Sequence, residues 1–209
     1  MYLINKTYFR NKLEIIGLYD DNNKSEDKLN DYISIYVIDF LQNLLGLADF
    51  TQLNSNISNG VLSVNAPQKW LDFVNGKTYT KDGKTYRWEG LLYLRGSVKM
   101  SILTNIVYCK LIADLFSNNG KATITTKNSI QSVPSQNLVE AYNEIVKQLH
   151  DERFFKQVYL INDVPFIDYY GSEKTDYVTL SEYLKDHSDV YENVNFDNEY
   201  KEYKNSFDI

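Results

Sequence analysis

The sequence predicts a mainly α-helical protein that carries one β-hairpin. Apolar residues recur at helical spacing over residues 29–47 and again over residues 98–116. Residues 77–88 instead alternate around a central Asp-Gly pair, which is typical of a two-residue hairpin turn. With 209 residues, of which 43% are hydrophobic, the chain is long enough to fill one core.

We expect three parts along the chain. They are an N-terminal arm and linker over residues 1–28, a helical core with the hairpin over residues 29–155, and a C-terminal extension over residues 156–209. Short apolar clusters between residues 4 and 16 end at Gly17, so the arm is expected to be extended or to form an edge strand.

The first half of the core should contain one long and one short helix. Residues 29–47 have apolar side chains nearly all round, so this helix is expected to be buried on most sides. After a polar loop at residues 54–60, residues 66–74 form a short helix that opens at Pro67 and ends at Gly76.

The hairpin at residues 77–88 is the clearest local pattern. Pairing around the turn places Tyr79 opposite Tyr86 on one face and Lys81 opposite Lys84 at the tip. Two opposed lysines are tolerable only in solvent or against an acidic partner.

The second half of the core continues with helices. Residues 98–116 have a wide apolar face and should form the central helix. A Thr-rich extended segment is expected at residues 122–130, followed by a helix that Ser135 caps and that ends near Asp151.

The C-terminal extension holds all of the net acidity. The whole chain carries a formal charge of −6, and residues 168–209 contain eleven Asp or Glu and four Lys or Arg. They also contain many aromatic residues and a short helix at 180–186. Such a segment either folds against a partner or neighbouring subunit or stays a solvated tail. The first alternative is favoured, because a solvated tail would expose many aromatic side chains to water. Deleting it should leave a folded core but weaken assembly.

Composition excludes several functions. An acidic chain lacks the attraction to phosphate that nucleic-acid binders use, and no apolar run approaches the roughly 18 residues of a membrane span. Cys109 is expected to pack in the core. His150 and His187 have no ligand partners at metal-binding spacing, and glycine-rich nucleotide motifs and the Gly-x-Ser-x-Gly motif are absent from the sequence. We therefore expect neither an enzyme nor a bound metal or cofactor.

Several segments together resemble a known family. They are 40–46 (Phe-Leu-Gln-Asn-Leu-Leu-Gly), 70–73 (Trp-Leu-Asp-Phe), Gly76, Tyr79, 88–91 (Trp-Glu-Gly-Leu), Tyr108 and 140–143 (Glu-Ala-Tyr-Asn). This pattern, spread over residues 29–150, resembles the head-to-tail connector (neck, ring or adaptor) proteins of tailed bacteriophages, most of all those of crAss-like phages. The long acidic tail departs from the compact members.

The resemblance implies a structural virion protein with a helical connector-type core, a projecting β-hairpin and an extended C-terminal tail. It implies a homo-oligomeric closed ring, usually twelve-fold, that binds the portal protein and other neck or tail proteins. Such a ring extends the portal channel, helps to retain or pass DNA during genome ejection without binding it specifically, and docks the tail. It would assemble in the host bacterial cytoplasm and reside in the neck of the virion, without a membrane.

A ring needs contacts between identical neighbours, which projecting hairpins and tails can supply. The expected interface residues are Tyr79, Lys81, Lys84, Tyr86, Trp88, Tyr183, Tyr191, Phe196, Tyr200, Tyr203 and Phe207. For Trp88, together with Trp70 and Phe73, the alternative is that these rings cover the chain's own helical core. Two other functions stay open: another virion assembly part, such as a tail adaptor or stopper, and a small enzyme or ligand-binding protein.

Overall fold

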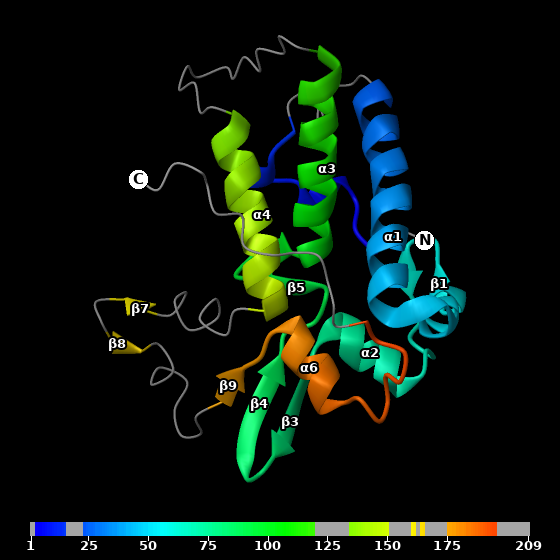
Figure 1. The fold of residues 1–209 in the computed structure, drawn as a ribbon, viewed down its shortest axis with the longest axis vertical. Helices are drawn as coiled ribbons and strands as arrows, with labels where there is room; N and C mark the ends of the chain where they lie inside the picture. The colour runs from blue at the N-terminus through cyan, green and yellow to red at the C-terminus, as the bar shows by residue number, and fades with distance from the viewer. Residues whose placement is uncertain are drawn as a thin grey trace.

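The chain forms a mainly helical fold with small two-stranded hairpins, as the sequence predicts. The structure is a computed structural model that describes residues 3–15, 23–119, 134–150, 160–161, 164–165 and 175–195. Helices α1, α3 and α4 lie side by side, and the β3–β4 hairpin projects beyond one end of them, next to α2 and α6 (Figure 1). The predicted extended segment at residues 122–130 lies outside the described residues.

Helix α1 (Asn23–Ser55) bends at Gly46, whose φ of 73° and ψ of 164° interrupt the helix. Its core face repeats every four residues, and its buried members are Leu29, Ile33, Val37, Leu41 and Leu45. The opposite face is exposed and carries Asp31, Ile35 and Asp39. The prediction of burial on most sides is therefore wrong for this face, where Ile35 faces solvent. Tyr36 and Ile38 are partly buried against the core.

Helix α1 is also the one helix of the described residues that is long and apolar enough, by length and composition, to cross a membrane. This finding corrects the statement that no segment approaches that apolar length. Its apolar face is buried against the rest of the chain and it bends at Gly46. We interpret α1 as a core helix.

Helix α2 (Gln68–Asn75) lies within two residues of the predicted bounds 66–74, and the hairpin after it has the predicted bounds. Pro67 precedes the helix, and Gly76, with a φ of 92°, ends it. Strands β3 (Lys77–Lys81) and β4 (Lys84–Trp88) pair in the predicted register. Both residues of the turn between them have positive φ, 51° and 74°, which suits an Asp-Gly pair in a type I′ turn.

The central helix starts later than predicted. Residues 98–100 form β6 (Val98–Met100), which pairs with β5 (Tyr93–Arg95) around a turn at Gly96. Helix α3 (Ile102–Asn119) begins only at Ile102, and the hydroxyl of the preceding residue, Ser101, accepts the N–H of Leu103. Helix α4 (Pro134–His150) then packs against α3.

The N-terminal residues belong to the core and are not a separate arm. They form two short 3-10 turns, η1 (Lys6–Tyr8) and η2 (Asn11–Leu13). Four apolar side chains from this region are buried in the main hydrophobic cluster: Leu3, Ile4, Phe9 and Ile15. Tight turns bring irregularly spaced residues inward, so helix or strand periodicity gave no sign of their burial.

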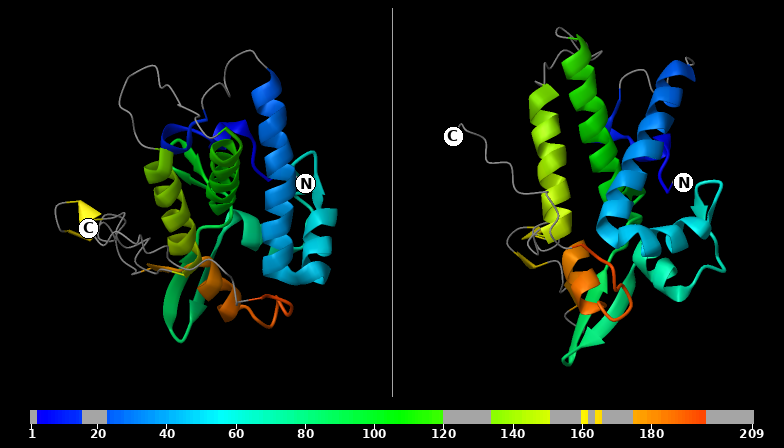
Figure 2. Two further views of the ribbon diagram at one scale, coloured as in Figure 1. Left: turned by 45° about the horizontal axis from the view of Figure 1, so that its top comes forward. Right: turned by 45° about the vertical axis from the view of Figure 1, so that its right-hand side comes forward.

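The described part of the C-terminal extension also belongs to the core. Strand β9 (Thr175–Tyr177) lies parallel to β4, and helix α6 (Leu180–Asp186) has the predicted bounds. A reciprocal capping box between Thr179 and Glu182 starts α6. Two further views show α6 beside α2 and the hairpin (Figure 2). For residues 175–195, both predicted alternatives, docking on another subunit and a solvated tail, are therefore wrong.

The remaining described elements are short hairpins. Strands β1 (Ile57–Ser58) and β2 (Val61–Leu62) form a turn-like hairpin after α1, within and just beyond the region predicted as a polar loop. Strands β7 (Leu160–Ile161) and β8 (Val164–Pro165) pair with each other. The core itself lies between the helical layer, the base of the β3–β4 hairpin and α6.

Candidate interaction surfaces

Three of the predicted interface residues are buried inside the chain. The rings of Trp88 and Tyr183 stack with centroids 5.5 Å apart, and the ring of Tyr191 lies 5.9 Å from that of Trp70. Their relative exposures are 3% for Trp88, 1% for Tyr183 and 2% for Tyr191. Side chains this buried offer no area to another subunit. For Trp88 the alternative of a core role is therefore confirmed, and it extends to the two tyrosines.

Hydrogen bonds fix this aromatic cluster, which we define as Trp70, Phe73, Trp88, Tyr183 and Tyr191. The indole N–H of Trp88 donates to the carbonyl oxygen of Phe73 at 3.0 Å. The hydroxyl of Tyr191 donates to the carbonyl oxygen of Lys69 at 2.7 Å. These bonds satisfy the indole of Trp88 and the hydroxyl of Tyr191, whereas the indole nitrogen of Trp70 has no hydrogen-bond partner among the described residues. The contacts join α2, β4 and the segment of α6 into one unit.

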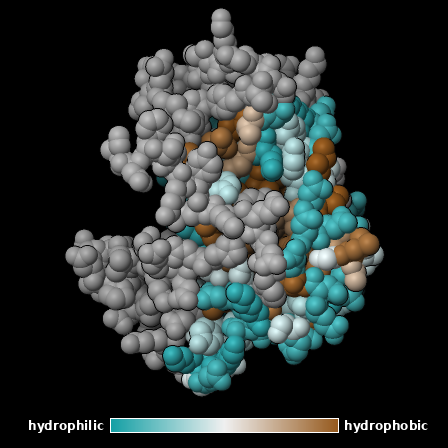
Figure 3. Space-filling model, viewed as in Figure 1, coloured by the Kyte–Doolittle hydropathy of each residue, from teal (hydrophilic) through white to brown (hydrophobic). Residues whose placement is uncertain are grey.

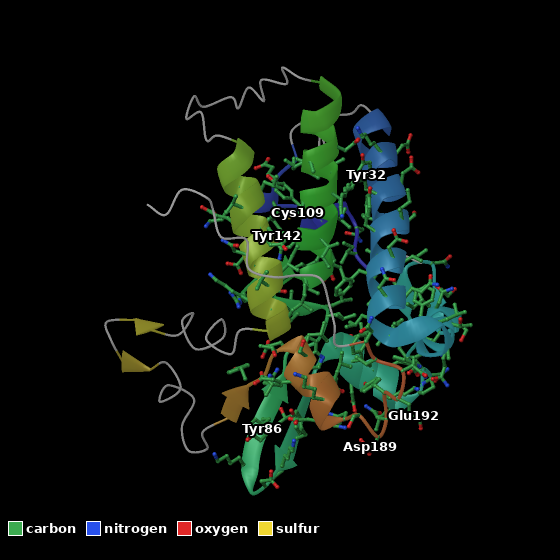
Figure 4. The ribbon with its side chains drawn as sticks, in the orientation of Figure 1. Tyr32, Tyr86, Cys109, Tyr142, Asp189 and Glu192 are labelled. Atoms are coloured by element: carbon green, nitrogen blue, oxygen red, sulfur yellow. The ribbon has the colours of Figure 1, made fainter. Side chains whose placement is uncertain are left out.

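Tyr79 and Tyr86 are half-buried and connect the hairpin to α6. Their rings stack across the two strands with centroids 5.6 Å apart. The Tyr79 hydroxyl donates to a carboxylate oxygen of Asp186 at 2.6 Å, and the ammonium of Lys81 donates to the other oxygen. Figure 4 shows Tyr86 on the hairpin, below α6. Asp186 is therefore an acidic partner for Lys81, one of the two opposed lysines, and it comes from the same chain.

The surroundings of Asp186 favour the ionised form of its carboxyl group. Burial by itself raises the pKa of this carboxyl, but the hydrogen bonds from Lys81 and Tyr79 outweigh burial, so the pKa lies below its usual value. The ionised carboxylate accepts from both donors at once. It fixes the hairpin at its midpoint against the end of α6.

In the outer part of the hairpin, only Lys81 takes part in these contacts. Residues 80–84 are exposed, and the hairpin extends past α6 (Figure 1). Lys84 makes no ion pair with any residue that the structure describes. The hairpin tip, defined as residues 80–84, remains available to a partner. The other four predicted interface residues, Phe196, Tyr200, Tyr203 and Phe207, lie outside the described residues.

A second exposed surface was missed by sequence reasoning. Leu47, Val61 and Val64 are 66%, 68% and 86% exposed, and we call these three residues the apolar corner. They lie just after the bend of α1 and on or next to β2, which pairs with β1 against α1. The space-filling view shows brown surface at this edge of the molecule (Figure 3). Leu47 stands at the end of the predicted helix at residues 29–47, and Val61 and Val64 are aliphatic residues in a region without helical spacing.

The side chains of the described residues that could bind a metal do not gather into one group. Within the described ranges, no three His, Cys, Asp or Glu side chains gather as metal ligands would. The His187 ring packs against Tyr79 and Tyr183, and its Nδ1 lies 2.9 Å from the carbonyl oxygen of Tyr183. Burial raises the pKa of the Cys109 thiol to about 12, although Lys110 opposes the shift.

Comparison of the chain with models of protein families, with curated proteins and with solved structures finds no significant match.

Proposed function

We propose that the protein is a head-to-tail connector subunit of a tailed bacteriophage, which assembles into a closed ring beneath the portal. The resemblance of residues 29–150 to the connector family raised this function, and the apolar corner is the observation that supports it best. Three large aliphatic side chains at one edge of the surface are typical of a protein–protein contact.

Ring closure sets a geometric requirement that this surface suits. Cyclic rings form through head-to-tail contacts, in which two different patches of each subunit meet. The apolar corner lies at the bend of α1, whereas the hairpin tip lies at the end of the β3–β4 ribbon (Figure 1). Two separate surfaces are what such a contact requires.

Burial of the apolar corner would provide the driving force. Fully burying a Val or Leu side chain contributes about 1.5–3 kcal/mol relative to leaving it exposed. The hairpin tip would add charge selectivity, because Lys84 suits an acidic surface on the neighbouring subunit, the portal or another neck protein.

The overall charge is compatible with a channel through which DNA passes. Each basic contact to phosphate adds a salt-dependent hold on the DNA. A chain with a net charge of −6 adds little such hold, so the channel would guide DNA without binding it specifically.

The test is the mass in solution, measured by light scattering after size exclusion. The protein is measured alone and mixed with the portal of the same phage. A closed oligomer with a mass that is a multiple of 24.4 kDa, or a stable complex with the portal, is expected. A monomer under both conditions would argue against a connector ring. Binding to other neck proteins but not to the portal would favour a tail adaptor or stopper.

Two matched variants locate the contact. Val61→Ser with Val64→Ser should reduce assembly, because both side chains belong to the apolar corner. Leu94→Ser with Val190→Ser removes two exposed aliphatic side chains elsewhere and should leave assembly intact. If the control pair disrupts assembly and the corner pair does not, the contact lies on another face.

A further inference from the structure

The turn between β1 and β2 consists of an Asn-Gly pair, Asn59 and Gly60. Because Ser58 pairs with Val61, these two residues are the whole turn. Both have positive φ, 51° and 79°, which is typical of a type I′ turn. Asn59 is exposed, and the strand after the turn begins with Val61, a member of the apolar corner. The pair therefore lies directly beside the proposed contact surface.

We propose that Asn59 is a site of spontaneous deamidation and that the acid formed there weakens assembly through the apolar corner; the effect on assembly rests on the proposed function. Hydroxide removes the proton from the main-chain nitrogen of Gly60, and this nitrogen attacks Cγ of Asn59. The N–Cγ bond closes a cyclic succinimide, the Cγ–Nδ2 bond breaks, and the amide nitrogen takes a proton from water and leaves as ammonia. A second water molecule opens the ring at either carbonyl, giving aspartate or isoaspartate.

The reacting groups of this pair are free of competing bonds. Neither the side-chain amide of Asn59 nor the N–H of Gly60 makes a hydrogen bond to the part of the chain that the structure describes. The closed turn must open before the Gly60 nitrogen can reach Cγ. Each strand of this hairpin has only two residues, and such small hairpins are marginally stable, so opening should cost little. Glycine also presents no side chain that would obstruct the attack.

A second Asn-Gly pair, Asn75 and Gly76 at the end of α2, is held closed. The N–H of Gly76 donates to the carbonyl oxygen of Asp72 at 3.0 Å. The backbone around Gly76 is so close that an added Cβ would lie 2.6 Å from the carbonyl oxygen of Trp88. The attacking nitrogen is therefore bonded and packed, so Asn59 should react about tenfold faster than Asn75 or more. The pair at residues 119–120 extends beyond the described residues.

The β3–β4 hairpin supplies the opposite comparison, because its turn has the same form but an acid in place of the amide. Asp82 has the same φ as Asn59, 51°, and is also followed by a glycine with positive φ. An ionised carboxylate resists attack by a nitrogen, so this pair should change far more slowly. The same turn shows that an Asp-Gly pair fits this backbone, and aspartate at residue 59 should therefore leave the fold intact.

Both products oppose burial of the apolar corner. Each adds a carboxylate two residues before Val61, and moving an unpaired charge out of water is costly. Isoaspartate also lengthens the main chain within the turn. Because the turn sets the pairing register of β1 and β2, this product should also displace Val61.

The modification is tested by peptide mapping with mass spectrometry, which needs no assembly. The full-length protein is incubated at pH 6 and at pH 8, and aspartate and isoaspartate are measured at each pair. Residue 59 should change first, and faster at pH 8, because hydroxide removes the proton. In denaturant Asn75 should react at a rate close to that of Asn59. An unchanged residue 59, or equal rates at the two asparagines in the folded protein, would overturn the assignment.

The effect on assembly is tested with variants by light scattering. Asn59→Asp should weaken assembly about tenfold or more, because it places the charge beside the contact. Asn59→Gly cannot react and keeps a residue that favours positive φ, so this variant should still assemble after incubation at pH 8. Ser97→Asp adds the same charge to the exposed turn of the β5–β6 hairpin and is the matched control.

The outcomes separate the two parts. Full assembly of Asn59→Asp, or an equal loss in Ser97→Asp, would overturn the effect at the corner. Fresh parent protein that never assembles would refute the ring and with it this effect, whereas peptide mapping still decides the modification itself.

Discussion

Replacing Tyr191 by alanine should destabilise the whole fold, although this residue lies in a segment that the sequence assigns to a separate tail. The ring is 2% exposed and its centroid lies within 6.0 Å of those of Trp70, Phe73 and Tyr183. Removing a buried aromatic ring costs about 3–5 kcal/mol, and the lost hydrogen bond to the carbonyl of Lys69 adds to this. We expect a loss of about 4 kcal/mol in the free energy of unfolding.

The assay is denaturant unfolding followed by tryptophan fluorescence, because both tryptophans of the chain belong to the aromatic cluster. For a chain of this size the melting temperature should fall by about 2–4 °C per kcal/mol. Tyr191→Phe keeps the ring and should cost only about 1 kcal/mol. Val190→Ala changes the exposed neighbour and should stay within about 0.5 kcal/mol. If Tyr191→Ala is no more destabilising than Val190→Ala, residues 175–195 are not part of the core.

Three further predictions concern single sites. Asp186→Asn should lower the free energy of unfolding at neutral pH. The pKa of Asp186 in the folded protein lies below its value of about 3.9 in an unfolded chain, so the difference from the parent protein should shrink as the pH falls below that range. Unfolding curves measured from pH 7 to pH 2 test this. Gly46→Ala should destabilise the fold more than Gly83→Ala. Both glycines have a similar positive φ, but only at Gly46 would the new Cβ meet backbone, 2.9 Å from the carbonyl oxygen of Asn193. Equal losses of stability in denaturant unfolding would refute a steric clash. Cys109 should resist a thiol reagent at pH 8 in the folded protein and react after unfolding, because burial raises its pKa to about 12; rapid labelling of the folded protein would contradict that burial.

Local chemistry explains which elements could be predicted from the sequence. The β3–β4 hairpin and helix α6 were placed correctly because their ends depend on neighbouring residues, an Asp-Gly turn in one case and a Thr-to-Glu capping box in the other. The start of α3 was misplaced because residues 98–100 fit the apolar pattern of a helix but pair with β5. Pairing between strands depends on contacts that periodicity does not contain.

The candidate surfaces could not be separated from the core by composition. Aromatic residues favour both protein interiors and interfaces, so Trp88, Tyr183 and Tyr191 fitted either location. Their burial depends on α6 returning to the hairpin, a contact between residues about a hundred positions apart. The apolar corner had the opposite problem. Leu47, Val61 and Val64 are aliphatic and look like ordinary core residues in the sequence, but the fold leaves them exposed.

The bend at Gly46 links the tail segment to the proposed contact surface. The N–H of Asn195 donates to the carbonyl oxygen of Leu44 at 2.9 Å, and Asn193 lies against Gly46. The exposed Leu47 follows directly. The segment therefore occupies the helix end that the bend creates, and it lies beside one residue of the apolar corner.

This arrangement changes how a deletion experiment must be interpreted. Removing residues 168–209 was expected to leave a folded core, but it would remove α6, the partner of Trp88 and the hydrogen bond at the bend. Lost assembly after such a deletion would therefore follow from lost folding alone. Leu47→Ser separates the two effects, because an exposed side chain contributes little to the free energy of unfolding but would be buried in the proposed ring. Unchanged unfolding with reduced assembly would assign the contact to the corner itself; unchanged assembly would remove Leu47 from it.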